Sequence, residues 1–269
     1  MIIHNFDPIL IDFGLFQIRW YSVAYIVGIL LGWQYANKII KLTTKNNLNF
    51  KQVSKTQFDD LIVYLVIGII LGGRLGYIIF YNLAYYIENF SEVFMLWQGG
   101  MSFHGGLAGV IISIIIFSKK TKISFFKFAD IVSCVAPIGI FLGRIANFIN
   151  AELYGKISTL PWAIIFPDAG NASRHPSQIY EAILEGVILF LLINYFALKK
   201  KFFFKSGYIS GLFLIFYSVL RLFSEIFREP DLHLGLFLNY FSMGAILSFI
   251  TFISGCSIIF FIKKNEQNN

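Results

Sequence analysis

An arginine, two asparagines and a glutamate follow one another at the end of a long apolar run. The run covers 131–142, and the polar residues after it are Arg144, Asn147, Asn150 and Glu152. If the run crosses a bilayer, Arg144 lies at its edge, and an arginine at the centre of a membrane helix costs about 2.5–3.5 kcal/mol. A partner or an anionic ligand must offset that cost. We therefore start from the hypothesis that Arg144 belongs to an anion site.

Two more arginines are expected at the same depth. Arg74, Arg144 and Arg221 each lie past the midpoint of an apolar run, and these runs are expected to cross the membrane in one direction. The forked guanidinium group can give a phosphate or a carboxylate two hydrogen bonds at once. Three arginines at one depth predict an anion site that opens towards one leaflet.

Carboxylates accompany these arginines. Arg221, Glu225 and Arg228 are spaced i, i+4 and i+7, so they share one stripe of a helix. One carboxylate between two arginines leaves a net positive charge, as an anion site requires. Glu181 and Glu185 share a face of another apolar run at i, i+4. For these two, structural pairing with arginines and a functional role are equally good interpretations.

His104 is the candidate general base. It lies about five residues inside the outer end of an apolar run and is flanked by glycines, with the expected depth of the arginines. A lone histidine in such a run is more often a hydrogen-bonded core residue, and an imidazole is also a common proton acceptor. The depth that it shares with Arg144 favours the functional interpretation.

Several familiar kinds of site are absent from the sequence. It contains no P-loop, no Gly-x-Ser-x-Gly, no His-Glu-x-x-His and no cysteine–histidine cluster with metal spacing. Cys134 and Cys256 both lie inside apolar runs and are interpreted as small core residues. We predict neither a metal site nor another cofactor.

The composition indicates the kind of protein that holds these residues. Hydrophobic residues make up 57% of the 269 residues and charged residues 14%, against about a quarter charged in an ordinary soluble domain. We predict an all-α, polytopic membrane protein with one domain, 1–269, and a small extracytoplasmic cap at about 148–177. Its seven expected spans are 18–40, 60–82, 99–118, 126–147, 178–198, 208–227 and 239–262.

Lysines predict the orientation of the spans. Fifteen of the sixteen lysines lie in alternate loops and in the C-terminal tail, and Lys156 is the exception. By the positive-inside rule, the N-terminus is outside and the C-terminus is cytoplasmic. The net charge of +7 therefore reports membrane topology, and no nucleic-acid partner is predicted.

By themselves, these residues predict a membrane protein with an outer-leaflet anion site. A transporter for an organic anion is one alternative, and it would show internal repeats and polar groups continuing to the cytoplasmic side. A non-catalytic lipid-binding protein or scaffold is the other. It predicts that His104, Arg144 and Arg221 are replaceable at no cost except stability.

The run 143–155 resembles the signature of the bacterial phosphatidylglycerol–prolipoprotein diacylglyceryl transferases. The resemblance extends to 103–106, 174–181 and 221–231, and so to nearly the whole chain. Ala151 and Ser22 stand where the family commonly has glycine, which we interpret as a matter of helix packing. The loop between Phe166 and Arg174 is shorter than in many relatives.

The resemblance implies an enzyme of lipoprotein biogenesis in the bacterial cytoplasmic (inner) membrane. It would move the diacylglyceryl group of phosphatidylglycerol to the lipobox cysteine of a preprolipoprotein signal peptide. A thioether and glycerol 1-phosphate would form. Both substrates lie in the membrane, which agrees with a site in its outer half. Because the thiol comes from the substrate, this chain needs no reactive cysteine.

On this resemblance, Arg144 and Arg221 bind the lipid phosphate and His104 takes the thiol proton. A field of arginines that lowers the thiol pKa unaided is the alternative to a histidine base. Asn147, one turn from Arg144, binds the headgroup or orients the arginine. Further candidates for substrate binding are Tyr21, Glu152, Gly155, Glu225 and Arg228.

Overall fold

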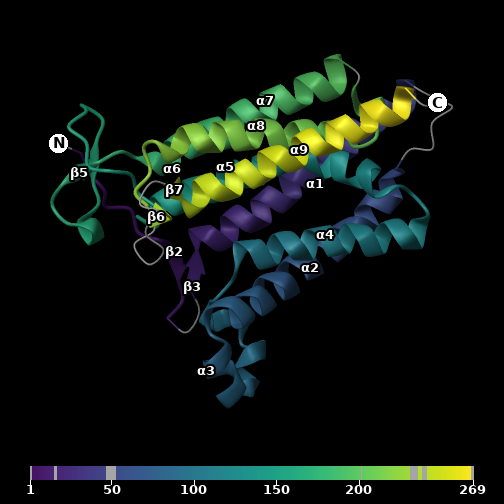
Figure 1. Ribbon diagram of the computed structural model, residues 1–269. Helices are drawn as coiled ribbons and strands as arrows, with labels where there is room; N and C mark the ends of the chain where they lie inside the picture. The colour runs from purple at the N-terminus through teal and green to yellow at the C-terminus, as the bar shows by residue number, and fades with distance from the viewer. Residues whose placement is uncertain are drawn as a thin grey trace. The chain divides into compact units, whose positions relative to one another are not determined.

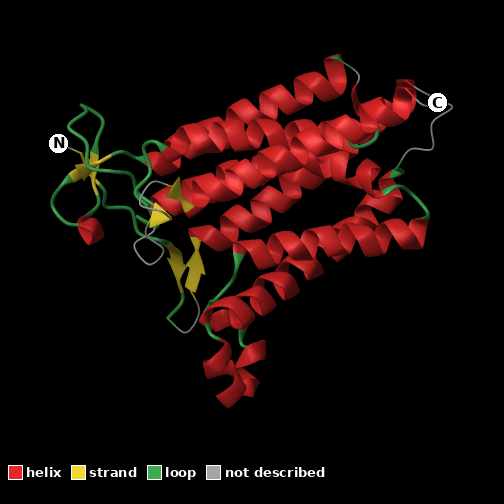
Figure 2. Ribbon diagram, in the orientation of Figure 1, coloured by secondary structure: helices red, strands yellow, loops and turns green. Residues whose placement is uncertain are grey.

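The computed structural model describes residues 2–14, 17–46, 53–200, 202–230, 236–237 and 241–267. This part of the chain is mostly helical, with a few short strands (Figure 2). Its helices form seven stretches long and apolar enough to cross a membrane, which confirms the predicted seven-span protein. These stretches are Trp20–Thr43, Lys55–Tyr81, Phe103–Thr121, Phe125–Ile149, Ser177–Lys199, Tyr208–Glu225 and Met243–Gln267.

The chain folds as two compact units, one formed by residues 1–36 with 130–269 and the other by residues 37–129. Within residues 37–129 lie the helices α2 (Lys55–Tyr81), α3 (Leu83–Glu88) and α4 (Phe103–Thr121), and the 3-10 turns η1 (Phe90–Phe94) and η2 (Leu96–Gln98). The capping box of Ser54 and Gln57 begins α2, and Ser102 caps α4.

Glycines hold α2 and α4 together. A Cβ added at Gly76 would lie 2.7 Å from the Cα of Gly105, and one at Gly72 would lie 3.0 Å from the Cα of Gly109. The two backbones therefore meet with no side chain between them, as in small-residue packing in lipid. Gly68, Gly72 and Gly76 recur every four residues, the sequence spacing that predicts such a packing face, and the structure confirms it.

Arg74 has a role that differs from the predicted one. Its guanidinium group donates to backbone carbonyls of the segment 92–100, with Nε at 3.0 Å from Val93 O and Nη2 at 2.6 Å from Glu92 O. Further bonds reach the carbonyl oxygens of Met95, Gly99 and Gly100. Its donors fix the segment that joins α2 to α4, so the expectation that Arg74 contributes to an anion site is wrong.

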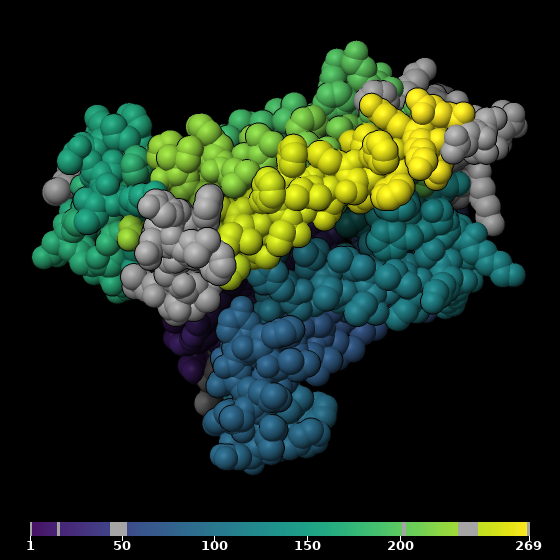
Figure 3. All heavy atoms as spheres, in the orientation of Figure 1, coloured from purple at the N-terminus to yellow at the C-terminus, as the bar shows by residue number. Residues whose placement is uncertain are grey.

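The other unit is built around a group of long helices (Figure 1). They are α1 (Trp20–Asn46) as far as residue 36, α5 (Phe125–Ile149) from residue 130 onward, α8 (Tyr208–Glu225), α9 (Met243–Gln267) and the continuous series α6 (Ser177–Glu181), η4 (Ala182–Ile188), α7 (Leu189–Asn194) and η5 (Tyr195–Lys199). A short 3-10 turn, η6 (Phe202–Phe204), precedes α8. In Figure 3, α9 (yellow) lies along the molecular surface, in agreement with its low burial.

Asp130 on α5 caps the N-terminus of α8. Its carboxylate accepts from the backbone N–H groups of Gly207 and Ser210 at 2.6 and 2.8 Å. A carboxylate at a helix N-terminus satisfies free N–H groups and offsets the helix dipole. This contact fixes α8 against α5 at the end of the helices opposite to the short strands (Figure 1).

Short strands gather at one end of these helices (Figure 2). They form a three-stranded sheet of β1 (Ile2–Ile3), β4 (Ile164–Ile165) and β5 (Ser173–Arg174), and the hairpins β2 (Ile9–Asp12) with β3 (Gln17–Arg19) and β6 (Leu236–Phe237) with β7 (Phe241–Ser242). The 3-10 turn η3 (Pro167–Ala169) lies between β4 and β5. The all-α prediction thus omitted these strands.

The N-terminal strand is tied to the loop predicted as a cap. His4 is 5% exposed and its Nε2 lies 2.7 Å from the carbonyl oxygen of Phe148. The rings of Phe148 and Phe166 pack around the imidazole at centroid distances of 5.3 Å. Residues 148–177, which we call the cap, therefore fold together with residues 2–4.

Replacing Arg74 by lysine is expected to loosen the segment 83–101. A lysine has one ammonium group with three donors and cannot reproduce the bonds that the planar fork makes to five carbonyls. Chymotrypsin should then cut more rapidly at Phe90, Phe94 and Trp97, which are 69%, 69% and 80% exposed. Mass spectrometry of the fragments measures the rate, with Arg19→Lys, at an exposed arginine, as control. Equal cleavage rates for both variants would contradict the role given to Arg74.

Candidate functional site

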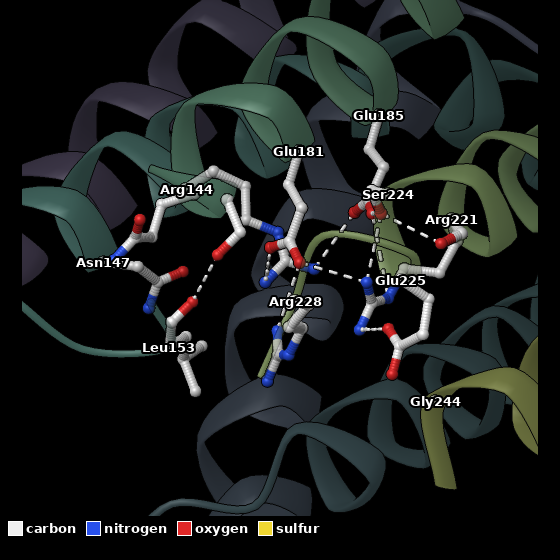
Figure 4. A network of polar contacts seen from close by, with 12 residues as sticks. Arg144, Asn147, Leu153, Glu181, Glu185, Arg221, Ser224, Glu225, Arg228 and Gly244 are labelled. Atoms are coloured by element: carbon white, nitrogen blue, oxygen red, sulfur yellow. Dashed lines mark hydrogen bonds and ion pairs between the residues drawn. The ribbon is translucent and has the colours of Figure 1, made fainter. Parts of the chain in front are cut away.

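Arg144 lies near the end of α5 that faces the cap, and two carboxylates hold it. Its Nη1 lies 2.8 Å from Oε2 of Glu181, and its Nη2 lies 3.0 Å from Oε2 of Glu185. The arginine side chain is 17% exposed, whereas both glutamates are fully buried. The guanidinium thus has a fixed orientation and keeps some access to its surroundings (Figure 4).

Arg221 approaches the same two carboxylates from α8. Its Nη1 lies 3.0 Å from Oε1 of Glu181, and its Nε lies 3.7 Å from Oε1 of Glu185. A third carboxylate, Glu225, lies 2.6 Å from its Nη2 one turn further along α8. Glu181 also contacts Arg228, at 3.3 Å from Nη1. One buried glutamate therefore touches three arginines.

These six residues form what we call the arginine–glutamate cluster: Arg144, Arg221, Arg228, Glu181, Glu185 and Glu225. Removing one partner of a buried ion pair costs about 3–5 kcal/mol, because the other charge stays buried without compensation. Ser224 adds a hydroxyl that donates to Glu185 at 3.2 Å. The network therefore fixes the separation of the guanidinium groups on α5 and α8.

The helix that carries the glutamates changes its geometry at the cluster. Glu181 ends α6, and Glu185 lies in the π-helical segment η4. π-Helical turns are rare and often occur at functional sites. The wider turn accompanies a close approach to α5, where a Cβ on Gly186 would lie 2.6 Å from the Cβ of Phe141. The segment thereby brings both carboxylates against α5 and α8.

A second polar group lies beside Arg144 along α5. Asn147 donates through Nδ2 to the hydroxyl of Tyr21 and, at 2.8 Å, to Oε1 of Glu152. Gln178 fixes this turn by donating to the carbonyl oxygen of Glu152 at 2.6 Å. The structure thus brings Tyr21, Asn147 and Glu152 together, as hydrogen-bonding groups one helical turn from the arginine.

Gly155 occupies a crossing of backbones in which a side chain has no room. Its N–H donates to the carbonyl oxygen of His175 at 2.9 Å, and it pairs with Arg228 in an isolated β-bridge. An added Cβ would lie 2.6 Å from both the Cβ of His175 and the carbonyl oxygen of Phe227. Gly155 thus joins the cap to the end of α8.

His175 lies at this crossing, where burial and the Lys156 ammonium lower the pKa of its imidazole and so favour the neutral form.

Ala151 has a backbone conformation that suits glycine better. Its φ is +54°, and that of Leu153 is +57°, in the turn directly after α5. A side chain in the left-handed region costs roughly 1–2 kcal/mol. The sequence-based interpretation of Ala151 as a matter of helix packing is therefore wrong, because the backbone turn is the relevant constraint.

Not all predicted site residues lie in the unit of residues 1–36 and 130–269. His104 is on α4, in the unit of residues 37–129, where its side chain is exposed and its ring lies 5.6 Å from that of Phe103. Asp231, the last residue of the resemblance, lies outside the described residues. In the sequence, Glu181 and Glu185 fit structural pairing with arginines and a functional role equally well. The signal was available: two carboxylates four residues apart in an apolar span need cationic partners.

Seven helices long and apolar enough to cross a membrane define a multi-pass membrane protein, and one of its two compact units holds a buried cluster of arginines and glutamates. Comparison with known proteins identifies its family. The family model for prolipoprotein diacylglyceryl transferases matches residues 8–261, and the chain belongs to this family.

Curated relatives named phosphatidylglycerol–prolipoprotein diacylglyceryl transferase agree with this assignment. The relative from Rickettsia canadensis (strain McKiel) is 49% identical over 260 residues, which cover 96% of this chain and 98% of the relative. The relative from Rickettsia typhi is 48% identical with the same coverage. That from Rickettsia bellii is 47% identical over 263 residues, 97% of this chain and 96% of the relative.

Gly155→Ala is expected to destabilise the protein and to lower its activity. The added methyl group forces the backbones of the cap and of α8 apart, and overpacking of this kind costs about 1–3 kcal/mol. Thermal unfolding in detergent measures the loss. Gly139→Ala is the control, because a Cβ at this helical position meets nothing within 4 Å. Equal unfolding temperatures for the two variants would contradict the close approach described here.

Ala151→Gly is expected to stabilise the turn after α5. Glycine removes the left-handed strain, a gain of about 1 kcal/mol that its greater freedom in the unfolded chain partly offsets. The same thermal unfolding assay should show a higher midpoint than for the unchanged protein. A lower midpoint would mean that the methyl group makes contacts worth more than the strain.

Proposed function

We propose that Arg144 and Arg221 bind the phosphate of phosphatidylglycerol and neutralise the charge that develops on it during transfer. As a prolipoprotein diacylglyceryl transferase, this chain moves the diacylglyceryl group of phosphatidylglycerol to the cysteine of a prolipoprotein. One observation carries the proposal: Glu181 and Glu185 bind both arginines and so hold two guanidinium groups next to each other.

The reaction explains why cations are needed. The bond between the glyceryl carbon and a phosphate oxygen breaks, and its electron pair stays on the phosphate. A bond between this carbon and the cysteine sulfur forms, and the thiol gives up its proton. Glycerol 1-phosphate leaves with more negative charge than the diester carried. Fixed positive groups close to the leaving oxygen stabilise that charge most strongly in the transition state.

The two arginines differ in a way that suits this task. Arg144 is 17% exposed and is bound by two carboxylates, while Arg221 is 9% exposed and is bound by three. We assign first contact with the phosphate to Arg144, because more of its guanidinium is accessible. Arg228, held by Glu181, adds positive charge to the same cluster.

Tyr21, Asn147 and Glu152 are proposed to recognise the glycerol headgroup. Their hydroxyl, amide and carboxylate groups offer both donors and acceptors, as two vicinal hydroxyls require. They lie one helical turn from Arg144, beside the arginine proposed to hold the phosphate. Glu225 pairs with Arg221 and so completes the arginine–glutamate cluster. Gly155 lets the cap pass close to the end of α8.

His104 is proposed as the base that takes the thiol proton. A free thiol has a pKa of about 8.5, so deprotonation at neutral pH benefits from a base. The exposed side chain of His104 supports the assignment because a substrate can reach it. The alternative is that the field of the arginines lowers the thiol pKa without a base.

We further propose that the site lies in the outer half of the bacterial cytoplasmic (inner) membrane, with the N-terminus outside. The lysine distribution supports this orientation. The cluster lies at the helix ends that carry the cap, away from the lysine-rich ends. The preprolipoprotein signal peptide would then present its lipobox cysteine from within the membrane, and no nucleic acid is involved.

Arg144→Ala is expected to reduce diacylglyceryl transfer by about 100-fold or more, the usual cost of removing one fixed donor to a developing charge. The assay uses purified protein with phosphatidylglycerol and a lipobox peptide, and mass spectrometry quantifies the adduct and glycerol 1-phosphate. A peptide with serine in place of cysteine must give no adduct.

Lys205→Ala is the matched control for Arg144→Ala. It also removes one cation from an ion pair, with Glu266 at 2.8 Å, on the exposed surface. Unchanged transfer by a folded Arg144→Ala variant would show that the phosphate role is wrong.

A further inference from the structure

The arginines of the cluster are paired with carboxylates of the same chain. Three arginines and three glutamates face one another among the described residues (Figure 4). Glu181 uses both carboxylate oxygens, one for Arg144 and the other for Arg221 and Arg228. A site built for the tightest possible hold on an anion would leave its cations without such partners.

The reaction gives a reason for limited affinity. The phosphodiester of phosphatidylglycerol carries one negative charge, whereas a phosphate monoester carries between one and two at neutral pH. Uncompensated arginines would therefore hold the product more tightly than the lipid. Tight product binding slows turnover, because release then limits the rate.

We propose that Glu181 and Glu185 are counter-charges that limit the affinity of Arg144 and Arg221 for glycerol 1-phosphate and so permit its release. This rests on the proposed function, in which the two arginines hold the phosphate. Both glutamates act through the arginines, so they are positioning residues that also set the charge of the site.

Burial distinguishes these two glutamates from the third. Glu181 and Glu185 are completely buried, each contacts more than one arginine, and Ser224 also bonds to Glu185. An entering anion cannot displace them without leaving buried charges unpaired. Glu225 is 13% exposed and contacts Arg221 within its own helix. The buried pair is therefore held against the arginines more firmly than Glu225 is.

Conservative variants separate this role from simple support of the fold. Glutamine has the shape of glutamate without its charge, whereas aspartate keeps the charge on a shorter side chain. If the carboxylates serve geometry alone, both replacements disturb the arginines and weaken phosphate binding. If they limit affinity by charge, Glu181→Gln and Glu185→Gln strengthen it, while the aspartate variants stay near the unchanged protein.

The experiment measures binding of glycerol 1-phosphate to the full-length protein in lipid nanodiscs by isothermal titration calorimetry. Each glutamine variant is expected to lower Kd by about tenfold or more, since one negative charge within a few ångströms of the phosphate is removed. In the transfer assay, kcat and the KM for phosphatidylglycerol should both fall, with a first turnover faster than the steady state.

Glu229→Gln is the matched control. It removes a carboxylate paired with an arginine, Arg174 at 3.2 Å, outside the cluster. Its Kd for glycerol 1-phosphate should equal that of the unchanged protein. Thermal unfolding identifies the variants that are folded, and whichever of Glu181→Gln and Glu185→Gln folds is sufficient for the comparison.

The outcomes also separate this inference from the proposed function. If Arg144→Ala leaves glycerol 1-phosphate binding unchanged, the phosphate role itself fails. If Arg144→Ala abolishes binding while the glutamine variants weaken it or leave it unchanged, the counter-charge proposal alone is wrong. If both aspartate variants fold and neither glutamine variant does, the carboxylates serve the stability of the fold, and the proposal is again wrong.

Discussion

Guanidinium groups buried between apolar helices require negative charge beside them, and the rest of this structure depends on that requirement. Two fully buried glutamates, Glu181 and Glu185, supply it for arginines from both α5 and α8. The same contacts join three separate stretches of the chain at one point. Because an unpaired charge in such a place costs several kcal/mol, the pairing fixes how these helices meet. Stability and the geometry of the site thus have one origin.

Local structure at the ends of the helices serves this arrangement. The π-helical segment η4 begins directly after Glu181, and the turn with positive φ at Ala151 and Leu153 begins directly after α5. Gly155 then lets the cap pass close to the end of α8. These irregular features concentrate where the polar groups gather, whereas Asp130 holds the opposite end of α8 with an ordinary helix cap. Departures from regular geometry are expected at functional sites rather than in the supporting helices.

Much of this could be predicted from the sequence, because hydrophobic length and glycine spacing are local signals. The seven spans follow from hydrophobic length, and the four-residue spacing of Gly68, Gly72 and Gly76 indicates the face on which α2 packs. The bonds of Arg74 could not be predicted, because every residue carries a backbone carbonyl and the residue types therefore give no signal. The short strands and the π-helical segment could not be predicted either, because they depend on contacts between distant residues. Glu181 and Glu185 could have been assigned to the arginines, because two carboxylates in an apolar span cannot remain unpaired.

The central claim is that Arg144 and Arg221 contact the lipid phosphate directly. Solid-state NMR on protein with ¹⁵N-labelled guanidinium groups, in bilayers that contain phosphatidylglycerol, measures nitrogen–phosphorus dipolar couplings. We expect a coupling of the strength found for hydrogen-bonded nitrogen–phosphorus pairs. The coupling should be weaker in each of the single variants Arg144→Lys and Arg221→Lys, and unchanged in Arg174→Lys. A strong coupling that both cluster variants leave unchanged, or the absence of any coupling while the lipid is bound, would contradict it.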